Sequence, residues 1–574
     1  MSFPTRSVPK PYDPDRPFLI TGNRQWSYGD LFSLANVWKT RIQDLMHQSS
    51  AIARTGQTHR PGTFLLLRSR NREALLLHLA CAWISRVPVL PLDPAMPASE
   101  LESLSATLPW DSALVDEPGA APSIGLIHEN PSLGTIRKIF SWANEPGTES
   151  KKWQQMDTTE LLGAPDAWWG ALLTSGSSGP PKTVPHKRRS WIHAVEWTQT
   201  QTPMDPGDAW LLPLPLHHAG GMNVTIRALL TGSAVLLPRT LDPSGLAEAL
   251  RTHPEIRAAS MVPTQLGRLL GERTLPTLSS FHGILVGGGP IRESLLNRAV
   301  ERGLPVIASY GMTETVGQIA SRCHTASEET APATTRSMSE SESVAEKMTG
   351  SLPIPGPHPP STPTLRVHAP HEVRILDEFG SPRAGEGEGV LQIRGPQLFE
   401  GYLEGRTLQR DRFDPDGWFN TGDWARLHPG EQPDEQLLEI LSRRTDLILS
   451  GGENVLPTRV ERVLESLPEI REALVVGIED SEWGERVVAL VIPDPDETAI
   501  IPTSDWNELE DVSARTGMQE LADSIRERIT GQLTPAERPK EILFVDRLPT
   551  LGPGKHDRRE AKEHVRIKLR NQSG

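Results

Sequence analysis

LLTSGSSGPPK, residues 172–182, is an apolar segment that runs into a loop of small hydroxyl and glycine residues and ends in a lysine. The apolar residues predict a buried strand. Backbone N–H groups and hydroxyls in such a loop can surround a phosphate chain, and Lys182 adds a positive charge. The loop differs from a Walker loop, because Pro180 and Pro181 precede the lysine where that motif has glycine. A flexible Gly/Ser linker is the alternative, which the preceding strand and the Pro-Pro-Lys ending disfavour.

Apolar runs on both sides of this segment predict further buried strands, with helical patterns between many of them. Strands that alternate with helices are typical of βαβ units in a mostly parallel sheet. The predicted strands are 63–67, 87–91, 209–214, 234–238, 284–286 and 306–309. The predicted helices are 30–42, 73–84, 223–230 and 291–302.

Residues 445–574 follow a different pattern and predict a compact α+β unit, with a boundary near residues 442–446. The predicted fold class is therefore α/β: a large N-terminal domain of mixed or parallel sheets with helices over residues 1–444, and a small C-terminal α+β domain on a hinge. A stretch rich in Ser, Thr, Glu and Pro, about 324–363, predicts a disordered insertion, and 494–517 predicts an acidic loop. The predicted C-terminal elements are helix 456–467, strand 473–478, strand 487–492, helix 521–533 and strand 541–545.

The chain is acidic, because 59 Lys+Arg against 73 Asp+Glu give a formal net charge of -14 over 574 residues. This balance argues against a general nucleic-acid or anionic-membrane binder, which needs a basic surface. The 2 cysteines exclude a disulfide scaffold and a Cys-based zinc site, and they fit a reducing compartment. The most apolar run, 74–84, is far short of the roughly 20 residues that cross a membrane, and we expect a cytoplasmic protein.

Four further glycine-containing segments follow the first one in order. Each alone could be only a turn, but together with 172–182 their order resembles the adenylate-forming superfamily of acyl- and aryl-CoA synthetases, peptide-synthetase adenylation domains and luciferases. The resemblance runs from about Trp26 to Lys555, which is nearly the whole chain. The four segments are GGGP at 287–290, SYGMTET at 309–315, GWFNTGD at 417–423 and SRRTDLILSGGEN at 442–454.

The resemblance implies a two-step reaction with ATP, Mg²⁺ and coenzyme A: a carboxylic acid is joined to AMP and then passed to a thiol. It implies that Lys555 in Gly-Pro-Gly-Lys is catalytic together with His218 and Thr313, that Glu314 binds Mg²⁺, and that Thr445 is the hinge. Gly451 and Gly452 are implied to bind coenzyme A. The implied ATP-binding residues are Thr174, Ser175, Gly176, Ser177, Ser178, Gly179, Lys182, Gly288, Gly289, Tyr310, Gly311, Met312, Asp423 and Arg443.

Within the superfamily, PLHHAGG at 215–221 and the glycine segments after it look most like the ligases that act on o-succinylbenzoate in menaquinone or phylloquinone biosynthesis. This branch implies that His218, Arg227 and Gly311 contact the acid. A loop histidine and a packing arginine are the alternatives for His218 and Arg227. Three departures from the family pattern fall within its motifs. Thr183 stands where glycine is usual, His556 stands where an aliphatic residue is usual, and Ala219-Gly220 replace the larger or hydroxyl residues usual after the histidine.

Three other functions stay open at this point. The chain could be another aryl- or fatty-acyl-CoA synthetase, which acid specificity would separate. It could be an adenylation domain that loads a carrier protein, although no phosphopantetheine-bearing domain is visible. It could be a nucleotide-binding protein without catalysis, against which Lys555 and Glu314 argue.

Overall fold

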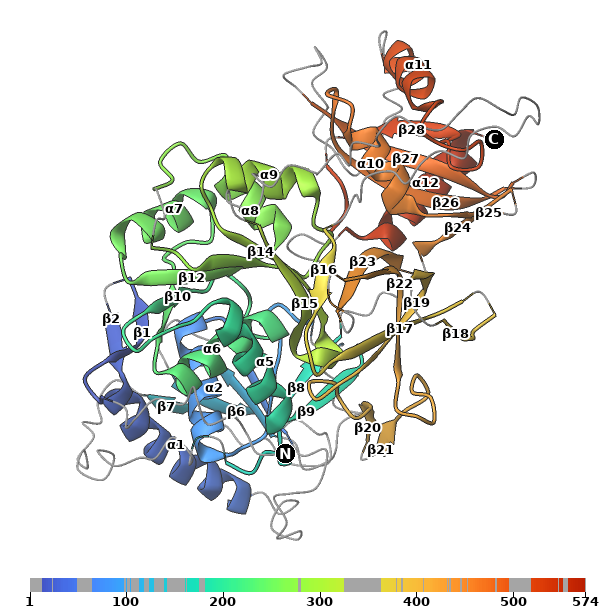
Figure 1. The fold of residues 1–574 in the computed structure, drawn as a ribbon. Helices are drawn as coiled ribbons and strands as arrows, with labels where there is room; N and C mark the ends of the chain where they lie inside the picture. Colours follow the sequence, from blue (N-terminus) through green and yellow to red (C-terminus); the bar gives the residue numbers. More distant parts are fainter. Residues whose placement is uncertain are drawn as a thin grey trace, which may run out of the picture.

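In the computed structural model, the described part of the chain forms three β-sheets and the helices that cover them (Figure 1). The segments expected to lack regular structure, about 324–363 and 494–517, lie outside the described residues except at their ends. The structure describes residues 13–22, 24–48, 64–97, 100, 104, 113–117, 123–127, 139–141, 161, 163–174, 181–276, 280–324, 363–377, 379–383, 386–405, 407–430, 432, 435–443, 446–451, 453–480, 483–494, 518–545, 547–550 and 556–572.

The largest sheet of the described chain has 14 strands, parallel in one half and antiparallel in the other. In spatial order they are β18 (Pro382–Arg383), β17 (Glu372–Leu376), β19 (Gly387–Arg394), β22 (Phe419–Pro429), β23 (Gln436–Arg443), β16 (Leu365–Val367), β15 (Gly317–His324), β14 (Val306–Met312), β13 (Gly283–Val286), β12 (Ile256–Met261), β10 (Ala209–Leu211), β11 (Ala234–Leu237), β1 (Pro17–Thr21) and β2 (Arg24–Ser27). From β11 to β14 all neighbours are parallel, as the βαβ pattern predicts. From β14 to β18 all are antiparallel, so the expectation of a mostly parallel sheet is wrong there. Neighbours such as β22 and β23 follow one another directly, and a short turn can join only antiparallel strands.

The second sheet places the loop 175–180, which is itself outside the described residues, between two paired strands. The predicted strand before the loop is β8 and the segment after it is β9, and the two are antiparallel. Thr183 is buried at the start of β9 and pairs with both Leu173 and Leu403, so a β-branched residue fits here. The order is β21 (Thr407–Gln409), β20 (Tyr402–Glu404), β9 (Thr183–Lys187), β8 (Trp168–Leu173), β4 (Val89–Pro91), β3 (Leu65–Ser69), β5 (Ala113–Glu117), β6 (Ser123–Ile127) and β7 (Ile139–Ser141).

Helices fill the space between these two sheets and cover the outer face of the first. The alternation in β10 shows this, because Trp210 packs into the layer between the sheets while Ala209 and Leu211 pack on the opposite face. The inner layer holds α1 (Tyr28–Gln48), α2 (Arg72–Ser85), α5 (Arg188–Gln201) and α6 (Ala219–Thr231). The outer layer holds α7 (Pro243–Thr252), α8 (Pro263–Leu269) and α9 (Glu293–Glu301).

The third sheet forms the C-terminal unit, drawn in orange to red in Figure 1. Its strands are β25 (Glu453–Val455), β24 (Ile448–Ser450), β27 (Gly484–Pro493), β26 (Ile470–Asp480) and β28 (Glu541–Phe544). Alternate residues of β27 face two separate cores, one with α10 (Pro457–Glu465) and α11 (Met518–Ile529), the other with α12 (Arg558–Gln572).

Element ends differ from the sequence prediction where backbone chemistry intervenes. The strand predicted at 209–214 ends at Leu211, because Pro213 and Pro215 have no N–H to donate to a ladder. The strand predicted at 306–309 continues to Met312, so the glycine segment after it is itself paired. The helix predicted at 223–230 begins earlier, at Ala219.

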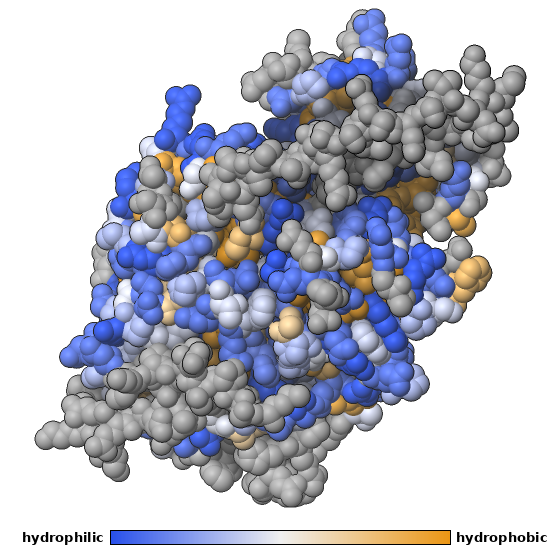
Figure 2. Space-filling view, viewed as in Figure 1, coloured by the Kyte–Doolittle hydropathy of each residue, from blue (hydrophilic) through white to orange (hydrophobic). Residues whose placement is uncertain are grey.

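On the face drawn in Figure 2, the described surface is mostly hydrophilic, with small, scattered apolar spots. Within the described ranges, no helix combines the length and the apolar character that crossing a membrane requires.

Arg188 joins two elements of the inner layer through a buried cation. Its guanidinium lies 3.7 Å from the ring centroid of Trp83 and donates to the carbonyls of Trp83 at 3.0 Å and Leu161 at 2.6 Å. Burial, with a smaller effect of Arg86, lowers the pKa of Arg188 to about 9, so the side chain stays charged at neutral pH. This buried cation therefore satisfies two carbonyls that lie far from solvent.

Replacing Arg188 by Met should lower stability by about 2–4 kcal/mol, because two buried carbonyls lose their donors and the stacked cation is lost. Arg189→Met is the matched control. The Arg189 side chain is 35% exposed and forms ion pairs with Asp166 and Glu400, so its replacement should cost less than about 1 kcal/mol. Thermal unfolding of both variants checks this, and equal losses would contradict the assigned role.

Candidate active site

Several of the predicted site residues lie at one edge of the first sheet. Strands β10, β12, β13 and β14 are parallel, so their carboxyl ends meet at this edge, which is where open α/β sheets bind ligands. The segment with His218 follows β10, Gly288 and Gly289 follow β13, and Tyr310 to Met312 complete β14. The order of motifs in the sequence therefore becomes proximity in the fold.

The hairpin that carries the predicted phosphate loop is closed by Thr174 and Lys182. The Thr174 N–H donates to the Lys182 carbonyl at 3.0 Å, and the Lys182 N–H donates to Thr174 Oγ1 at 3.1 Å. Lys182 Nζ lies 4.6 Å from the ring centroid of Tyr402, so its cation sits over an aromatic face. Five predicted loop residues lie outside the described residues: Ser175, Gly176, Ser177, Ser178 and Gly179.

Glu314, the predicted magnesium ligand, lies buried next to Lys182. The Tyr402 hydroxyl donates to Glu314 Oε1 at 2.6 Å, and burial together with this carboxylate raises the pKa of Tyr402 above its usual range. Lys182 and Glu314 thus contact the same tyrosine, Lys182 at the ring face and Glu314 at the hydroxyl. Mg²⁺ in nucleotide sites is commonly held by one or two carboxylates plus phosphate oxygens, so a single buried Glu314 fits that chemistry. Among the described residues, no group of three or more His, Cys, Asp or Glu side chains could hold a metal ion.

Thr313 is held from the second sheet by a residue that the sequence analysis missed. His186 on β9 contacts the Thr313 carbonyl through Nε2 at 2.8 Å. Burial lowers the pKa of His186 to about 3, so the ring is neutral and Nε2–H is the donor. The strand after the phosphate loop therefore fixes the turn that carries Glu314.

Asp423 lies at the centre of the predicted nucleotide residues. Its carboxylate accepts from the Tyr310 hydroxyl at 2.5 Å and pairs with Arg443 Nε at 2.9 Å. Asp423 is 4% exposed, and Asp423 and Arg443 are directly opposite in the β22–β23 ladder. Burial and the Asp423 charge raise the pKa of Tyr310, and the same carboxylate raises the pKa of Arg443. Three residues predicted separately to contact the nucleotide therefore form one hydrogen-bonded unit.

Gly311 is required by close approach of two backbones. A Cβ at this position would lie 2.0 Å from the Gly317 carbonyl oxygen of the paired strand. The same turn holds Val316 at a φ of 47°, which is strained for a β-branched residue. Asn223 of α6 donates to the Val316 carbonyl, so α6 supports this strained turn.

Helix α6 and its N-cap carry two of the three residues predicted to contact the acid, His218 and Arg227. His218 is its N-cap, and the His217 and His218 rings lie 4.4 Å apart. Burial, with His218, lowers the pKa of His217 to about 4, although Asp93 opposes the change. Arg227 lies one turn beyond Asn223 and is 3% exposed, and among the described residues its buried Nε and Nη1 have no acceptor. A buried guanidinium with two unpaired donors is costly unless an anion completes it.

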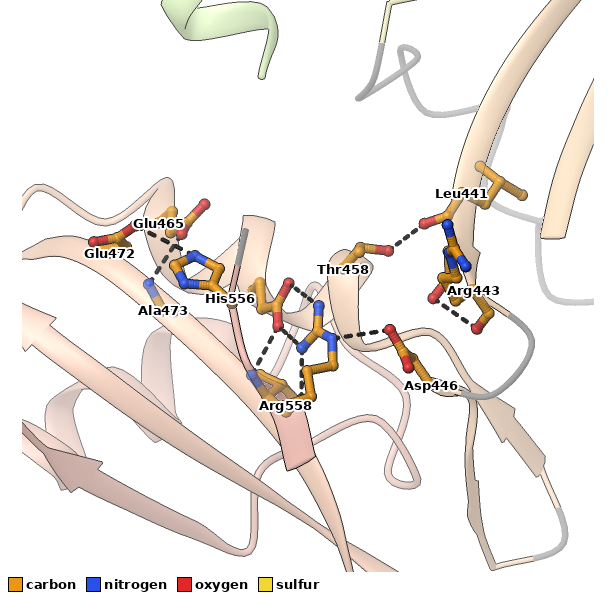
Figure 3. A network of polar contacts seen from close by, with 12 residues as sticks. Leu441, Arg443, Asp446, Thr458, Glu465, Glu472, Ala473, His556 and Arg558 are labelled. Carbon is orange, nitrogen blue, oxygen red and sulfur yellow. Dashed lines mark hydrogen bonds and ion pairs between the residues drawn. The ribbon is translucent and has the colours of Figure 1, made fainter. Parts of the chain in front are cut away.

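Figure 3 shows the contacts around the predicted hinge. Thr445, Gly452 and Lys555 lie outside the described residues, whereas Gly451 is described at the β24–β25 turn with a φ of 58°. Thr458 of α10 donates to the Leu441 carbonyl at 2.5 Å and so joins the C-terminal unit to β23. Arg558 pairs with Asp446, one residue after Thr445 (Figure 3). It also pairs with Glu461 of α10.

A second contact between the units involves Glu465 of α10. Its Oε1 lies 2.5 Å from Arg292 Nη2 and also accepts from the Ala473 N–H at 2.9 Å. Burial raises the pKa of Glu465 to about 7, although Arg292 opposes the change. Nearby Glu472 behaves oppositely: burial is outweighed by its contact with His556 at 3.3 Å, and its pKa is lowered.

Several supporting residues have no sequence signal of their own. Tyr402, His186 and Asn223 contact motif residues from other elements, yet each lies in an ordinary strand or helix pattern. For two of them the sequence offers an indirect signal: His186 lies in the strand that follows the phosphate loop, and Asn223 lies in the helix that His218 caps.

Comparisons with known proteins identify the family of the chain. A family model described as "AMP-binding enzyme" matches residues 11–403, and its companion "AMP-binding enzyme C-terminal domain" matches residues 459–555. The chain therefore belongs to the AMP-binding enzyme family, the adenylate-forming superfamily whose motifs it carries.

Curated relatives within this family are named for one acid. The chain is similar to the 2-succinylbenzoate–CoA ligase of Enterococcus faecalis, at 27% identity over 94% of each chain. It is similar to the ligase of the same name from Bacillus anthracis, at 30% identity over 69% of each.

Solved structures share the fold. The o-succinylbenzoate CoA synthetase of Bacillus subtilis, bound to its acyl-adenylate intermediate, matches with a TM-score of 0.68 at 23% identity over 96% of each chain. ATP-bound MatB from Rhodopseudomonas palustris also has a TM-score of 0.68, at 19% identity over 96% of each chain. Two differently named enzymes match equally well, so the fold by itself does not select the acid.

The first prediction for the site concerns Gly311. Gly311→Ala should reduce the rate of adenylate formation at least tenfold, because the new Cβ must push β14 and β15 apart beside Tyr310. Gly267→Ala in α8 is the control, since its Cβ would meet only Leu295 Cδ1 at 3.7 Å. The control should be neutral or slightly stabilising. Similar losses of ATP–pyrophosphate exchange in both variants would show that the close approach at Gly311 is unimportant.

The second prediction concerns pH. A folded-state pKa of about 7 for Glu465 exceeds the unfolded value of about 4.3, so the folded protein binds this proton more tightly. The resulting stability is complete below about pH 4.3 and is lost as pH rises through 7. As the pH rises from 5 to 8, the melting temperature of the wild type should therefore fall relative to that of Glu465→Gln. Glu472 is the control, because its pKa is lowered in the folded state: the melting temperature of Glu472→Gln relative to wild type should not change between pH 5 and 8. Identical pH profiles for the two variants would contradict the raised pKa of Glu465.

Proposed function

We propose that this chain is an ATP-dependent acid–thiol ligase that activates o-succinylbenzoate as its acyl-adenylate and transfers the acyl group to coenzyme A, in menaquinone or phylloquinone biosynthesis. The observation that supports this proposal most directly is Arg227, a buried cation on the helix that His218 caps, with two donors that have no acceptor among the described residues. o-Succinylbenzoate has two carboxylates, of which only the succinyl one reacts. The aromatic carboxylate needs a cation that holds it without reacting, and Arg227 supplies one.

The nucleotide residues have distinct roles in this proposal. Asp423 accepts hydrogen bonds from the ribose hydroxyls on lone pairs that Tyr310 and Arg443 leave free, and the two partners fix its orientation. The Tyr310 ring stacks on adenine. Gly288, Gly289 and Met312 at the same strand ends line the nucleotide. Thr174 and Lys182, with the intervening loop, hold the phosphates.

In the first half-reaction, the succinyl carboxylate attacks the α-phosphate of ATP and pyrophosphate leaves. Two anions must approach each other, so positive charge has to be in place beforehand. Lys182 and Lys555 supply this charge, and Mg²⁺ bound through Glu314 neutralises phosphate oxygens when present. Thr313, whose carbonyl is held by His186, lies beside the reacting phosphate. Gly311, which the close approach of β15 keeps free of a side chain, contacts the acid.

In the second half-reaction, the thiol of coenzyme A attacks the activated carbonyl and AMP leaves. His218 gates the channel between the acid and the thiol, and Gly451 and Gly452 line the thiol side. We infer a domain division at residues 444 and 445, so that rotation about Thr445 exchanges the face with Lys555 for the face with Gly451.

Pyrophosphate exchange against a panel of carboxylic acids, with and without coenzyme A, tests the proposal. o-Succinylbenzoate should support the fastest exchange, and coenzyme A should convert its adenylate to a thioester. Preference for a monocarboxylic aryl or fatty acid would make the chain another acyl-CoA synthetase. Exchange without any transfer to coenzyme A would favour a carrier-loading adenylation domain.

Lys555→Ala should slow adenylation by roughly 10²–10³-fold, because one preorganised charge contact with the transition state is lost. Thioester formation from supplied acyl-adenylate should be nearly unchanged. Rapid-quench measurements of each half-reaction provide the comparison. Equal slowing of both halves would assign Lys555 a structural role instead.

A further inference from the structure

The guanidinium of Arg227 is held in a fixed plane by its neighbours. Its central carbon lies 3.9 Å from the ring centroid of Trp210, a distance at which cation and ring stack. The Trp210 indole N–H donates to Ser260 Oγ at 3.0 Å, so the ring itself cannot rotate freely. All three side chains are buried, with exposures of 3% for Arg227, 1% for Trp210 and 3% for Ser260.

Comparison with a second buried arginine, Arg188, shows that the hydrogen-bond donors of Arg227 are not all used. Arg188 stacks on Trp83 at 3.7 Å, and its donors reach two backbone carbonyls. Arg227 stacks in the same way, but no described residue accepts a hydrogen bond from its Nε or Nη1. The protein itself supplies acceptors for Arg188, whereas Arg227 keeps donors that can bind a ligand.

The charge on Arg227 persists in this setting. Burial lowers its pKa to about 9, which leaves the group protonated at neutral pH, and within the described residues no carboxylate pairs with it. An unpaired buried cation is expensive, so the surrounding structure must hold it in place for an anion that arrives from outside.

The position of the stack links it to the active-site edge. Trp210 and Ser260 lie near the carboxyl ends of the adjacent parallel strands β10 and β12, where the nucleotide segments also end. Arg227 follows Asn223 by one helical turn, and Asn223 donates to the carbonyl of Val316, two residues after Glu314.

We propose that Trp210 and Ser260 are positioning residues for acid selection: Trp210 holds the Arg227 guanidinium by its ring face, Ser260 holds Trp210, and the free donors of Arg227 bind the non-reacting carboxylate of a dicarboxylic aromatic acid. This inference rests on the proposed function and adds to it the two residues that orient the selecting cation. Neither residue touches the acid itself.

The readout is selectivity in pyrophosphate exchange. kcat/KM is measured for o-succinylbenzoate and for 4-oxo-4-phenylbutanoate, which lacks only the aromatic carboxylate. Trp210→Leu should lower kcat/KM for the diacid about tenfold, mainly through KM, while the monoacid changes less than about threefold. Trp210→Phe keeps a ring face under the guanidinium and should retain most of the selectivity. The KM for ATP should not change in either variant.

Ser260 gives the milder test, because Ser260→Ala leaves the aromatic core intact. It should reduce selectivity about threefold, and Ser260→Thr, which keeps a hydroxyl, should restore it. In an Arg227→Leu background, Ser260→Ala and Trp210→Leu should produce no further loss of selectivity, since both act through the guanidinium.

Two failures are distinguishable. If wild type prefers the diacid but the Trp210 and Ser260 variants lower kcat/KM equally for both acids, the two residues only stabilise the core, and the positioning role is overturned. If wild type does not prefer the diacid over the monoacid, the proposed function fails and this inference fails with it.

Discussion

The carboxylate of Asp423 is the contact on which the candidate site depends. It receives the hydroxyl of Tyr310 and the guanidinium of Arg443, which come from different parts of the large sheet. Tyr310 belongs to the last parallel strand, Asp423 to an antiparallel one, and Arg443 is the last residue of the strand before the predicted hinge. One buried anion therefore joins the parallel half, the antiparallel half and the approach to the C-terminal unit.

The change from parallel to antiparallel pairing at β14 makes this arrangement possible. Parallel strands bring the acid and nucleotide segments to one edge, and the antiparallel strands return Asp423 to the same place. The second sheet contributes from the opposite side, because Lys182, His186 and Tyr402 all reach the turn with Glu314, directly or through one another. The residues predicted to bind the nucleotide thus lie where the two sheets meet.

From the sequence, candidate nucleotide residues can be placed in the fold where a motif coincides with a strand end. Tyr310 and Asp423 were both expected to contact the nucleotide, and the structure brings them together. Contacts between residues far apart in the sequence are harder to predict. Tyr402 binds Glu314 across 88 positions, and no local sequence pattern marks Tyr402. Trp210 lies in an apolar run that reads only as a core strand, and its partner Arg227 is visible only through the family resemblance. The antiparallel half was missed because the pattern of alternating strands and helices ends at β14.

Calorimetric titration of ATP into wild type and Asp423→Asn tests the account most directly. Glu388→Gln is the matched control, because Glu388 pairs with Arg426 in the same β19–β22 region but lies away from Tyr310. The account predicts that Asp423→Asn weakens ATP binding about tenfold or more, since charged hydrogen bonds contribute about 1.5–3 kcal/mol. Glu388→Gln should bind ATP as wild type does. Unchanged affinity in Asp423→Asn, with the fold intact, would contradict the central place given to this carboxylate.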